Sequence, residues 1–183
     1  MYNESGKKGD IKWKILNPAA IVPTKRDEDA GFDIYTIEEG ITLFPNEKHL
    51  FKTGLAYAID SGYWLLAFDR GSTGSNGIHT HCGICDNGYR GEIFICLNND
   101  NSYPVRFTKN VNKITLEDVE EDLIFDDEGN IYHKILLYPT SKAIAQLIPM
   151  KQFKTNCSIA TDEEWEELKN TERGISALGA SGK

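Results

Sequence analysis

Residues 69–92 contain the densest set of groups in this chain that could do chemistry. Arg70, Gly71 and Ser72 open a turn that is rich in glycine, serine and threonine. Main-chain amides, hydroxyls and a guanidinium in such a turn can surround the oxygens of a phosphate. Most turns of this composition bind nothing, so by itself the pattern is only a weak indication of an anion site.

A candidate hydrolytic group follows in the same segment. Asp86 precedes the turn pair Asn87-Gly88, and Tyr89 comes directly after it. A carboxylate at such a turn could act as a general base toward a water molecule. A tyrosine three residues further on could offer a flat face to a sugar. Residues 69–92 therefore combine the parts of a phosphate site with the parts of a hydrolytic one.

The cysteines and histidines of this segment also allow a metal site. Cys82 and Cys85 have the Cys-x-x-Cys spacing of zinc ligands, and His79 and His81 lie just before them. A structural zinc site normally needs a second ligand pair, and none lies at a suitable spacing. Buried thiols and ordinary histidines are therefore favoured over zinc, and elemental analysis tests the alternative.

Short apolar runs separated by turn residues must position these groups. In residues 11–16, for example, Ile11, Trp13 and Ile15 alternate with lysines. Further short runs lie at residues 32–37, 41–44, 50–51, 55–59, 64–68 and 92–97. Many short strands with almost no helical period predict an all-β sandwich, jelly roll or barrel. One helix is expected at 162–169, where Thr161 and Glu164 can form a capping box.

Length and charge exclude several classes of protein. A chain of 183 residues suits a single domain over 1–183. Its 28 Asp+Glu exceed its 20 Lys+Arg, and the net charge of −8 argues against grip on nucleic-acid backbone or a membrane surface. No apolar run is long enough for a membrane span and no secretory signal is seen. The four cysteines form no spaced framework, so we expect a cytoplasmic location, or the host cytoplasm for a viral protein.

Residues 106–137 differ in composition from the rest. They contain eight acidic and four basic residues and so contribute −4 of the net charge of −8. Residues 126–130 indicate a hairpin turn in which Gly129 and Asn130 supply positive φ. Because roughly 30 residues seldom build a core of their own, the segment is predicted to be an inserted acidic arm. A solvated face is the favoured interpretation of this arm, and a surface that docks a protein partner is the alternative.

Five blocks of the chain, in order, resemble those of the trimeric dUTP diphosphatases (dUTPases). They are Ala30-Gly31-Phe32-Asp33-Ile34, Arg70-Gly71-Ser72, residues 83–92, residues 143–148 and residues 173–182. One block would be weak, but five in order with the third nearly complete are highly specific. The resemblance covers about residues 11–183, and the inserted arm is similar to those of phage-encoded members.

The resemblance implies a jelly-roll or β-barrel protomer in a homotrimer whose active sites are shared between subunits. It implies hydrolysis of dUTP to dUMP and pyrophosphate with Mg²⁺. By position, Asp86 would activate the water, Tyr89 would pack under the deoxyribose, and main-chain groups of Gly83 and Ile84 would read uracil. Asp33 would hold the hydrated Mg²⁺. The phosphate contacts would come from Arg70, Ser72, Gln146, Arg173 and Ser181, the last two from a flexible C-terminal flap at 171–183.

The chain departs from the family pattern at several site positions. Gly71 takes the place of the usual serine, Ala143 that of an arginine, Leu178 that of an aromatic residue and Ala180 that of a serine. These departures and the acidic arm motivate an alternative, a dUTPase-fold binding or regulatory protein with weak or no catalysis. A deaminase acting on dCTP is a third interpretation, which the Asp86-x-x-Tyr89 pattern disfavours.

Overall fold

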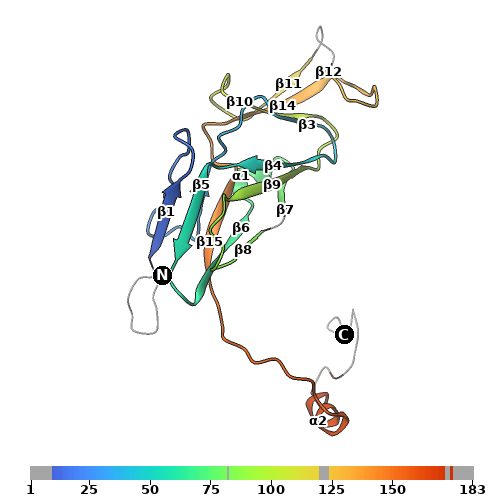
Figure 1. The fold of residues 1–183 in the computed structure, drawn as a ribbon. Helices are drawn as coiled ribbons and strands as arrows, with labels where there is room; N and C mark the ends of the chain where they lie inside the picture. The colour runs from blue at the N-terminus through green and yellow to red at the C-terminus, as the bar shows by residue number, and fades with distance from the viewer. Residues whose placement is uncertain (1–9, 82, 120–123, 172–173, 175–183) are drawn as a thin grey trace. The chain divides into compact units, whose positions relative to one another are not determined.

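The computed structural model describes residues 10–81, 83–119, 124–171 and 174 (Figure 1). The chain forms two compact units, Met1–Gln152 and Phe153–Lys183, which are described separately. Within the described residues the regular elements of the first unit are short β-strands, apart from one helical turn, and the expected all-β class is confirmed. No helix in the described parts of the chain is long and apolar enough to cross a membrane.

One four-stranded sheet carries most of the predicted site residues. Its strands, in spatial order, are β2 (Phe32–Ile34), β15 (Ala145–Lys151), β6 (Tyr63–Phe68) and β8 (Ile84–Cys85). Neighbouring strands are antiparallel throughout. The register pairs Asp33 with Gln146 and Gln146 with Phe68, while Leu66 pairs with Ile84. Two segments far apart in the sequence, blocks one and four of the resemblance, thereby become neighbours.

Two smaller sheets complete the lower part of this unit in Figure 1. The three-stranded sheet contains β4 (Lys48–Lys52), β9 (Phe94–Asn99) and β7 (Ile78–His81). The two-stranded sheet pairs β1 (Ile11–Ile15) with β5 (Leu55–Ile59). The alternation expected at 11–16 is therefore a strand, whose odd-numbered residues Ile11 and Trp13 pack against the core.

A second four-stranded sheet contains the ends of the predicted acidic arm. Its order is β11 (Thr115–Asp118), β14 (Lys134–Pro139), β10 (Val105–Thr108) and β3 (Thr42–Leu43). Phe107 and Leu136 are almost fully buried, so the outer residues of 106–137 belong to the core of the unit. The average composition of residues 106–137 is acidic because its carboxylates lie in the middle, while its two ends are apolar strands.

The middle of the arm forms the expected hairpin from β12 (Ile124–Phe125) and β13 (Ile131–Tyr132). Gly129 adopts the expected positive φ of 84°. Asn130 is not in that conformation, so this detail of the prediction is wrong. Its main-chain N–H and side-chain amide instead donate to the carboxylate of Asp126, at 2.8 Å each. The ring of Tyr132 lies 5.6 Å from that of Phe44, which holds the hairpin against the loop after β3.

Aromatic rings and aliphatic side chains from all the larger sheets form one core. Phe107 lies between Phe51 and Tyr138, with ring centroids 4.5 Å and 5.2 Å away. Leu55, Leu65, Leu97 and Ile144 are fully buried around this stack. Burial of such side chains is the main stabilising contribution, about 1.5–3 kcal/mol each. The core therefore fixes the strands whose ends carry the polar groups described below.

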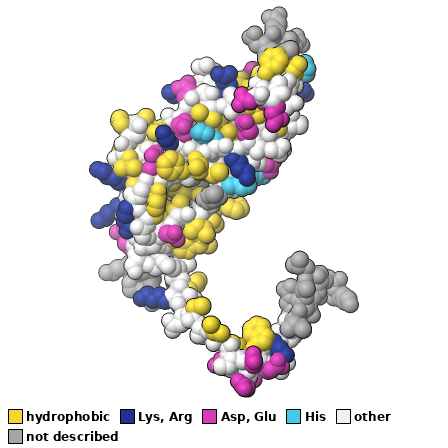
Figure 2. All heavy atoms as spheres, turned by 45° about the vertical axis from the view of Figure 1, so that its right-hand side comes forward, with side chains coloured by type: hydrophobic (Ala, Val, Ile, Leu, Met, Phe, Trp, Pro, Cys, Tyr) yellow, Lys and Arg dark blue, Asp and Glu magenta, His cyan; other side chains and the backbone are white. Residues whose placement is uncertain are grey.

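Two helices are present in the described residues. Helix α2 (Asp162–Leu168) begins at Thr161, and the predicted capping box with Glu164 is confirmed. The acidic side chains of the second unit gather on this helix (Figure 2). The single turn α1 (Gly71–Gly74) was not predicted. It forms because Thr73 is fully buried and its hydroxyl bonds to both the N–H and the carbonyl of Arg70, which outweighs the poor helix propensity of glycine.

Candidate active site

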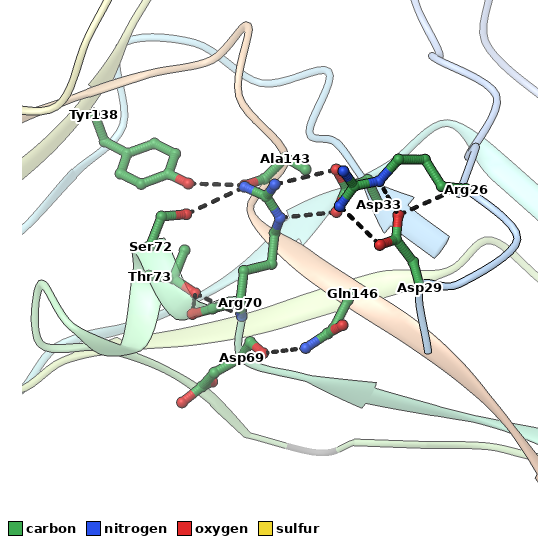
Figure 3. Close-up of polar contacts among 10 residues, drawn as sticks. All are labelled: Arg26, Asp29, Asp33, Asp69, Arg70, Ser72, Thr73, Tyr138, Ala143 and Gln146. Atoms are coloured by element: carbon green, nitrogen blue, oxygen red, sulfur yellow. Dashed lines mark hydrogen bonds and ion pairs between the residues drawn. The ribbon is translucent and has the colours of Figure 1, made fainter. Parts of the chain in front are cut away.

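A cavity of about 440 Å³ lies where β2, β15 and the loop after β6 meet. It is lined by polar and small residues: Arg26, Glu28, Asp29, Ala30, Gly31, Asp33, Arg70, Gly71, Ser72 and Gln146. Figure 3 shows how Arg26, Asp29, Asp33 and Arg70 of this set turn toward one another. Four of the residues predicted from the sequence, Asp33, Arg70, Ser72 and Gln146, are therefore brought together in one place.

The ion pair between Arg70 and Asp33 is the centre of this cavity. The guanidinium Nε lies 2.8 Å from Asp33 Oδ1, and one terminal nitrogen lies 3.1 Å from Oδ2. This two-point geometry is the strong form of an arginine–carboxylate pair. The side chains are 27% and 36% exposed. The pair is thus partly shielded from water but still open to a ligand.

Arg70 uses nearly all its hydrogen-bonding capacity within the protein. Its second terminal nitrogen donates to the hydroxyl of Ser72, at 3.1 Å, and to the carbonyl of Ala143, at 3.2 Å. With the two bonds to Asp33, four of the five guanidinium N–H groups have partners. Arg70 therefore holds Asp33, Ser72 and the loop before β15 in fixed positions, and one N–H is left for a ligand.

The same loop carbonyl is held from the core by Tyr138. The Tyr138 hydroxyl donates to Ala143 O at 2.7 Å. Burial raises the pKa of this hydroxyl, although the nearby Ser72 and Arg70 act in the opposite direction. The hydroxyl consequently remains a donor at neutral pH and supports the cavity wall from behind.

Gln146 points into the cavity because its amide is anchored at one end. Its Nε2 donates to the carbonyl of Asp69 at 2.6 Å. A Cβ at position 31 would lie only 2.9 Å from the Gln146 Oε1, so Gly31 lets the two strands approach each other closely. The side-chain oxygen is thus left facing Gly31 and the cavity.

Asp69, which receives this bond, is itself fixed by its carboxylate. His79 Nδ1 lies 2.8 Å from Oδ2, and the N–H of Thr80 donates to Oδ1 at 2.6 Å. Burial alone would raise the pKa of Asp69, but these two hydrogen bonds outweigh it and hold the pKa below its ordinary value. His79 therefore acts as a partner of Asp69. No cluster of three or more His, Cys, Asp or Glu in the described residues is arranged to hold a metal, and Cys82 lies outside them.

Sequence reasoning missed the loop that forms the other wall of the cavity. Arg26 makes a two-point ion pair with Asp29, with distances of 3.0 Å and 2.9 Å. The Arg26 side chain is 88% exposed and lines the cavity together with Glu28. The only signal in the sequence was the position of these charges just before the first block, and charged loops are common.

The remaining predicted residues lie in a second place, the turn after β8. Asp86 is exposed, Ile84 is 67% exposed and Tyr89 is 43% exposed. Gly83 packs closely against β6, since its carbonyl accepts a bond from Ala67 N at 2.6 Å and a Cβ there would lie 2.6 Å from Ala67 O. Among the described residues, none of these four lines the cavity.

The register of the sheet gives the separation between the two places. Cys85 pairs with Leu65, so Asp86 lies level with Trp64, about 13 Å along β6 from Phe68, the partner of Gln146. Asp33 and Asp86 also lie about 14 Å apart across the strands, since strands are spaced by about 4.8 Å. Together these offsets place the main chains of the two residues about 20 Å apart within one protomer. Arg173 and Ser181 lie outside the described residues.

Comparison with known proteins places this chain among enzymes of nucleotide metabolism. A sequence model of the family described as dUTPase matches residues 17–115. The chain is 32% identical over 181 residues to a deoxyuridine 5'-triphosphate nucleotidohydrolase of Nautilia profundicola, covering 94% of this chain and 99% of that protein. A Helicobacter pylori (strain P12) protein of the same name is 33% identical over 176 residues, covering 94% and 96%. The solved structure of the Staphylococcus bacteriophage 80alpha dUTPase with dUPNHPP has a TM-score of 0.69 at 25% identity, covering 95% and 99%.

Proposed function

The chain belongs to the dUTPase family, and we propose that it hydrolyses dUTP to dUMP and pyrophosphate with the residues described above. The observation that carries this proposal is the cavity in which Asp33, Arg70, Ser72 and Gln146 converge. Its lining is polar and charged, which suits a triphosphate with its metal ion and does not suit an apolar ligand. The net charge of −8 is no obstacle, since residues 106–137 contribute −4 of it and local donors decide binding.

The triphosphate lies in the cavity between β2 and the loop after β6. Ser72 and the remaining N–H of Arg70 are the donors nearest to the phosphates, and Gln146 lines the same cavity. Arg26 adds a second guanidinium on the facing wall, which offsets the arginine that Ala143 replaces. Arg173 and Ser181 of the C-terminal segment complete the phosphate contacts in this proposal, as the family resemblance implies.

Asp33 fits the expected Mg²⁺. Each carboxylate oxygen accepts one bond from Arg70, and each retains a lone pair that can accept a hydrogen bond from a metal-bound water. Such outer-sphere binding suits Mg²⁺, which dehydrates reluctantly and often keeps several waters. When bound, the ion would neutralise charge on the phosphate chain. The protein's own part is to hold that carboxylate at a fixed angle through Arg70.

The nucleoside lies on the turn after β8. Strand β8 is the last strand of its sheet, so the main-chain N–H and C=O groups of Ile84 on its open edge are available to uracil, whereas the carbonyl of the adjacent Gly83 is bonded to Ala67 N on β6. The half-exposed ring of Tyr89 provides a surface for the deoxyribose. The Asp86 carboxylate has no hydrogen-bond partner among the described residues, which leaves it free to hold and deprotonate a water molecule.

A triphosphate cannot reach both Asp33 and Asp86 inside one protomer, because the main chains of these residues are about 20 Å apart. We therefore infer that each site takes its Asp86 turn from one subunit and its phosphate cavity from another, in a homotrimer. A closed ring of three copies supplies three equivalent sites of this kind. We also expect the protein to work in the cytoplasm, or the host cytoplasm for a viral protein, because its four cysteines form no spaced disulfide framework.

Release of pyrophosphate from a panel of dUTP, dTTP, dCTP and UTP tests the reaction. We expect release from dUTP with Mg²⁺ and little from the others. Asp86→Asn should abolish turnover while sparing nucleotide binding, since only the base is removed. Absence of pyrophosphate at any enzyme concentration, or ammonia released from dCTP, would overturn the proposal.

Mixing two inactive variants tests the shared site. Asp86→Asn and Asp33→Asn proteins are unfolded, combined in equal amounts and refolded together. About one quarter of all sites in the refolded mixture then take an intact Asp86 from one subunit and an intact Asp33 from its neighbour. Activity should rise toward about one quarter of the wild-type value, while each variant refolded alone stays inactive. A site contained within one protomer would give no activity in any mixture.

A second candidate function is regulatory, through the acidic arm. The observation that favours it is an ordered hairpin, β12–β13, held on the unit by the Phe44–Tyr132 contact and rich in carboxylates. The phage 80alpha structures come from work in which phage dUTPases control transfer of virulence genes. Replacing residues 119–133 with a short turn leaves β11 and β14 intact. Loss of partner capture with unchanged pyrophosphate release would support docking, and unchanged capture would exclude it.

A further inference from the structure

We propose that Tyr57 and Asn87 form a clamp that sets the position of Asp86, and that both are positioning residues for the reaction. This inference rests on the proposed function of Asp86. It arises from hydrogen bonds that fix the main chain on both sides of this residue. Neither side chain lines the phosphate cavity.

Asp86 needs support from outside its own strand. Strand β8 contains only Ile84 and Cys85 and lies at the edge of its sheet. The turn itself supplies a single main-chain bond, from Tyr89 N to Asp86 O at 3.0 Å. Two strand residues and one turn bond are a weak hold on an exposed segment, whereas a general base must keep its oxygen within hydrogen-bond reach of the water.

Tyr57 fixes the Asp86 main chain from the core side of the turn. It lies on β5, is 2% exposed, and its hydroxyl donates to the main-chain carbonyl of Asp86 at 2.5 Å. Its ring packs against that of Trp13, with centroids 6.3 Å apart, so the hydroxyl is fixed by the core. Burial raises the pKa of Tyr57 to about 12. The hydroxyl therefore remains a donor over the whole working pH range of the enzyme.

Asn87 fixes the chain directly after Asp86 to the neighbouring turn between β5 and β6. Its Nδ2 lies within bonding distance of three main-chain carbonyls at the turn between β5 and β6: Ile59 at 3.2 Å, Asp60 at 2.9 Å and Tyr63 at 2.8 Å. Two N–H groups serve three acceptors, so one bond is shared. This ties the residue directly after Asp86 to a turn that belongs to two longer strands.

The two bonds act on successive residues of the chain. Tyr57 fixes the peptide group that follows Asp86, and Asn87 fixes the next residue. With both in place, the Asp86 side chain keeps only its own two torsions, and its carboxylate projects from an immobile base. Without them, the carboxylate can shift by an ångström or more, and a misplacement of that size can cost about 100-fold in rate.

Steady-state kinetics on two variants test the clamp. Tyr57→Phe removes only the hydroxyl, and Asn87→Ala removes the amide; both are assayed with dUTP beside wild type and Asp86→Asn. We expect kcat to fall by about 10- to 100-fold in each, with KM changed by less than about threefold, because substrate contacts remain. The acid limb of the pH profile should keep its midpoint, since Tyr57 does not titrate there.

Matched controls separate positioning from loss of stability. Asn99 is fully buried and its amide donates to the carbonyls of Leu43 and Tyr103, at 2.9 Å each, away from the Asp86 turn. Asn99→Ala should lower the thermal midpoint as much as Asn87→Ala does, yet leave kcat near wild type. Tyr132→Phe removes a hydroxyl bond to Asp126 in the arm and is the control for Tyr57→Phe. If Asn87→Ala fails to fold, Asn87→Ser, which keeps one short donor, replaces it in the test. Its kcat should lie between that of wild type and that expected for Asn87→Ala.

The outcomes distinguish the clamp from the function on which it rests. An inactive wild type, or an active Asp86→Asn, overturns the assignment of Asp86 and the clamp with it. If the wild type is active and Asp86→Asn is not, the assignment of Asp86 holds and the clamp is tested independently of it. It is then overturned if Tyr57→Phe and Asn87→Ala lose no more kcat than their controls, or if their loss appears in KM only.

Discussion

The ion pair between Arg70 and Asp33 is open to a quantitative test by a double-mutant cycle. Arg70→Gln removes the guanidinium and Asp33→Asn removes the carboxylate charge while keeping its shape. The pair is bidentate, with distances of 2.8 Å and 3.1 Å, and its side chains are 27% and 36% exposed. Exposed pairs contribute about 0–1 kcal/mol, whereas breaking a buried pair costs about 3–5 kcal/mol. We expect a coupling energy of about 1–2 kcal/mol, between these limits.

The single variants should differ in a way that follows from their partners. Arg70→Gln also removes the bonds to Ser72 Oγ and Ala143 O, and each such bond contributes about 1 kcal/mol net. It should therefore cost about 2–4 kcal/mol, and Asp33→Asn about 1–2 kcal/mol. Their losses are not additive, because each one alone already breaks the pair.

Urea unfolding of the four proteins at one fixed protomer concentration measures the cycle, since the stability of an oligomer depends on concentration. A coupling energy of about 0.3 kcal/mol or less would refute the reasoning. So small a coupling energy would mean that Arg70 gains little stability from its bonds to Asp33 and that its N–H groups are available to phosphate. In that case Arg70→Gln would act mainly on KM for dUTP and hardly on stability.

Three further predictions concern other parts of the chain. The pKa of Asp69 lies below its ordinary value in the folded state, so its stabilising contribution is present above about pH 4 and is lost as the pH falls through the folded pKa. Urea unfolding should therefore show that Asp69→Asn has a lower free energy of unfolding than wild type at pH 7, and that the difference shrinks toward pH 3. Arg26→Gln should raise KM for dUTP several-fold without changing the thermal midpoint, because the Arg26 side chain is 88% exposed; an unchanged KM would remove Arg26 from the phosphate site. Thr161→Ala should cost about 1 kcal/mol of helix stability at α2, seen as faster amide exchange at Glu164, its cap partner, and unchanged exchange would contradict the capping assignment.

Local patterns predicted the regular elements because short-range interactions decide them. The alternation of Ile11, Trp13 and Ile15 with lysines survives as β1, since a strand with one buried face requires period two. The capping box at Thr161 survives as the start of α2 for the same kind of reason. Helix α1 could not be predicted, because its turn depends on the burial of Thr73 by distant strands.

The candidate site was predictable only where the family resemblance supplied it. The resemblance named Asp33, Arg70, Ser72 and Gln146, and the fold brings them together. Spacing in the sequence could not reveal that Gln146 pairs with Asp33 across a ladder, since 113 positions separate them. Tyr57 and Asn87 were missed for a related reason: their acceptors are main-chain carbonyls, which leave no mark on residue type.

Hydrogen-bond accounting separates the residues that build the site from those that meet the substrate. Arg70 gives four of its five N–H groups to the protein, and Asn87 gives its whole amide nitrogen to three carbonyls. The Asp86 carboxylate accepts no hydrogen bond from the described residues, and among these residues the exposed guanidinium of Arg26 bonds only to Asp29. Groups whose bonds are already satisfied gain little from a ligand and resist displacement, whereas unsatisfied charged groups gain charge-assisted bonds when the ligand arrives. Substitutions in the first set should therefore be read out as stability and kcat, and those in the second as turnover or KM with the fold intact.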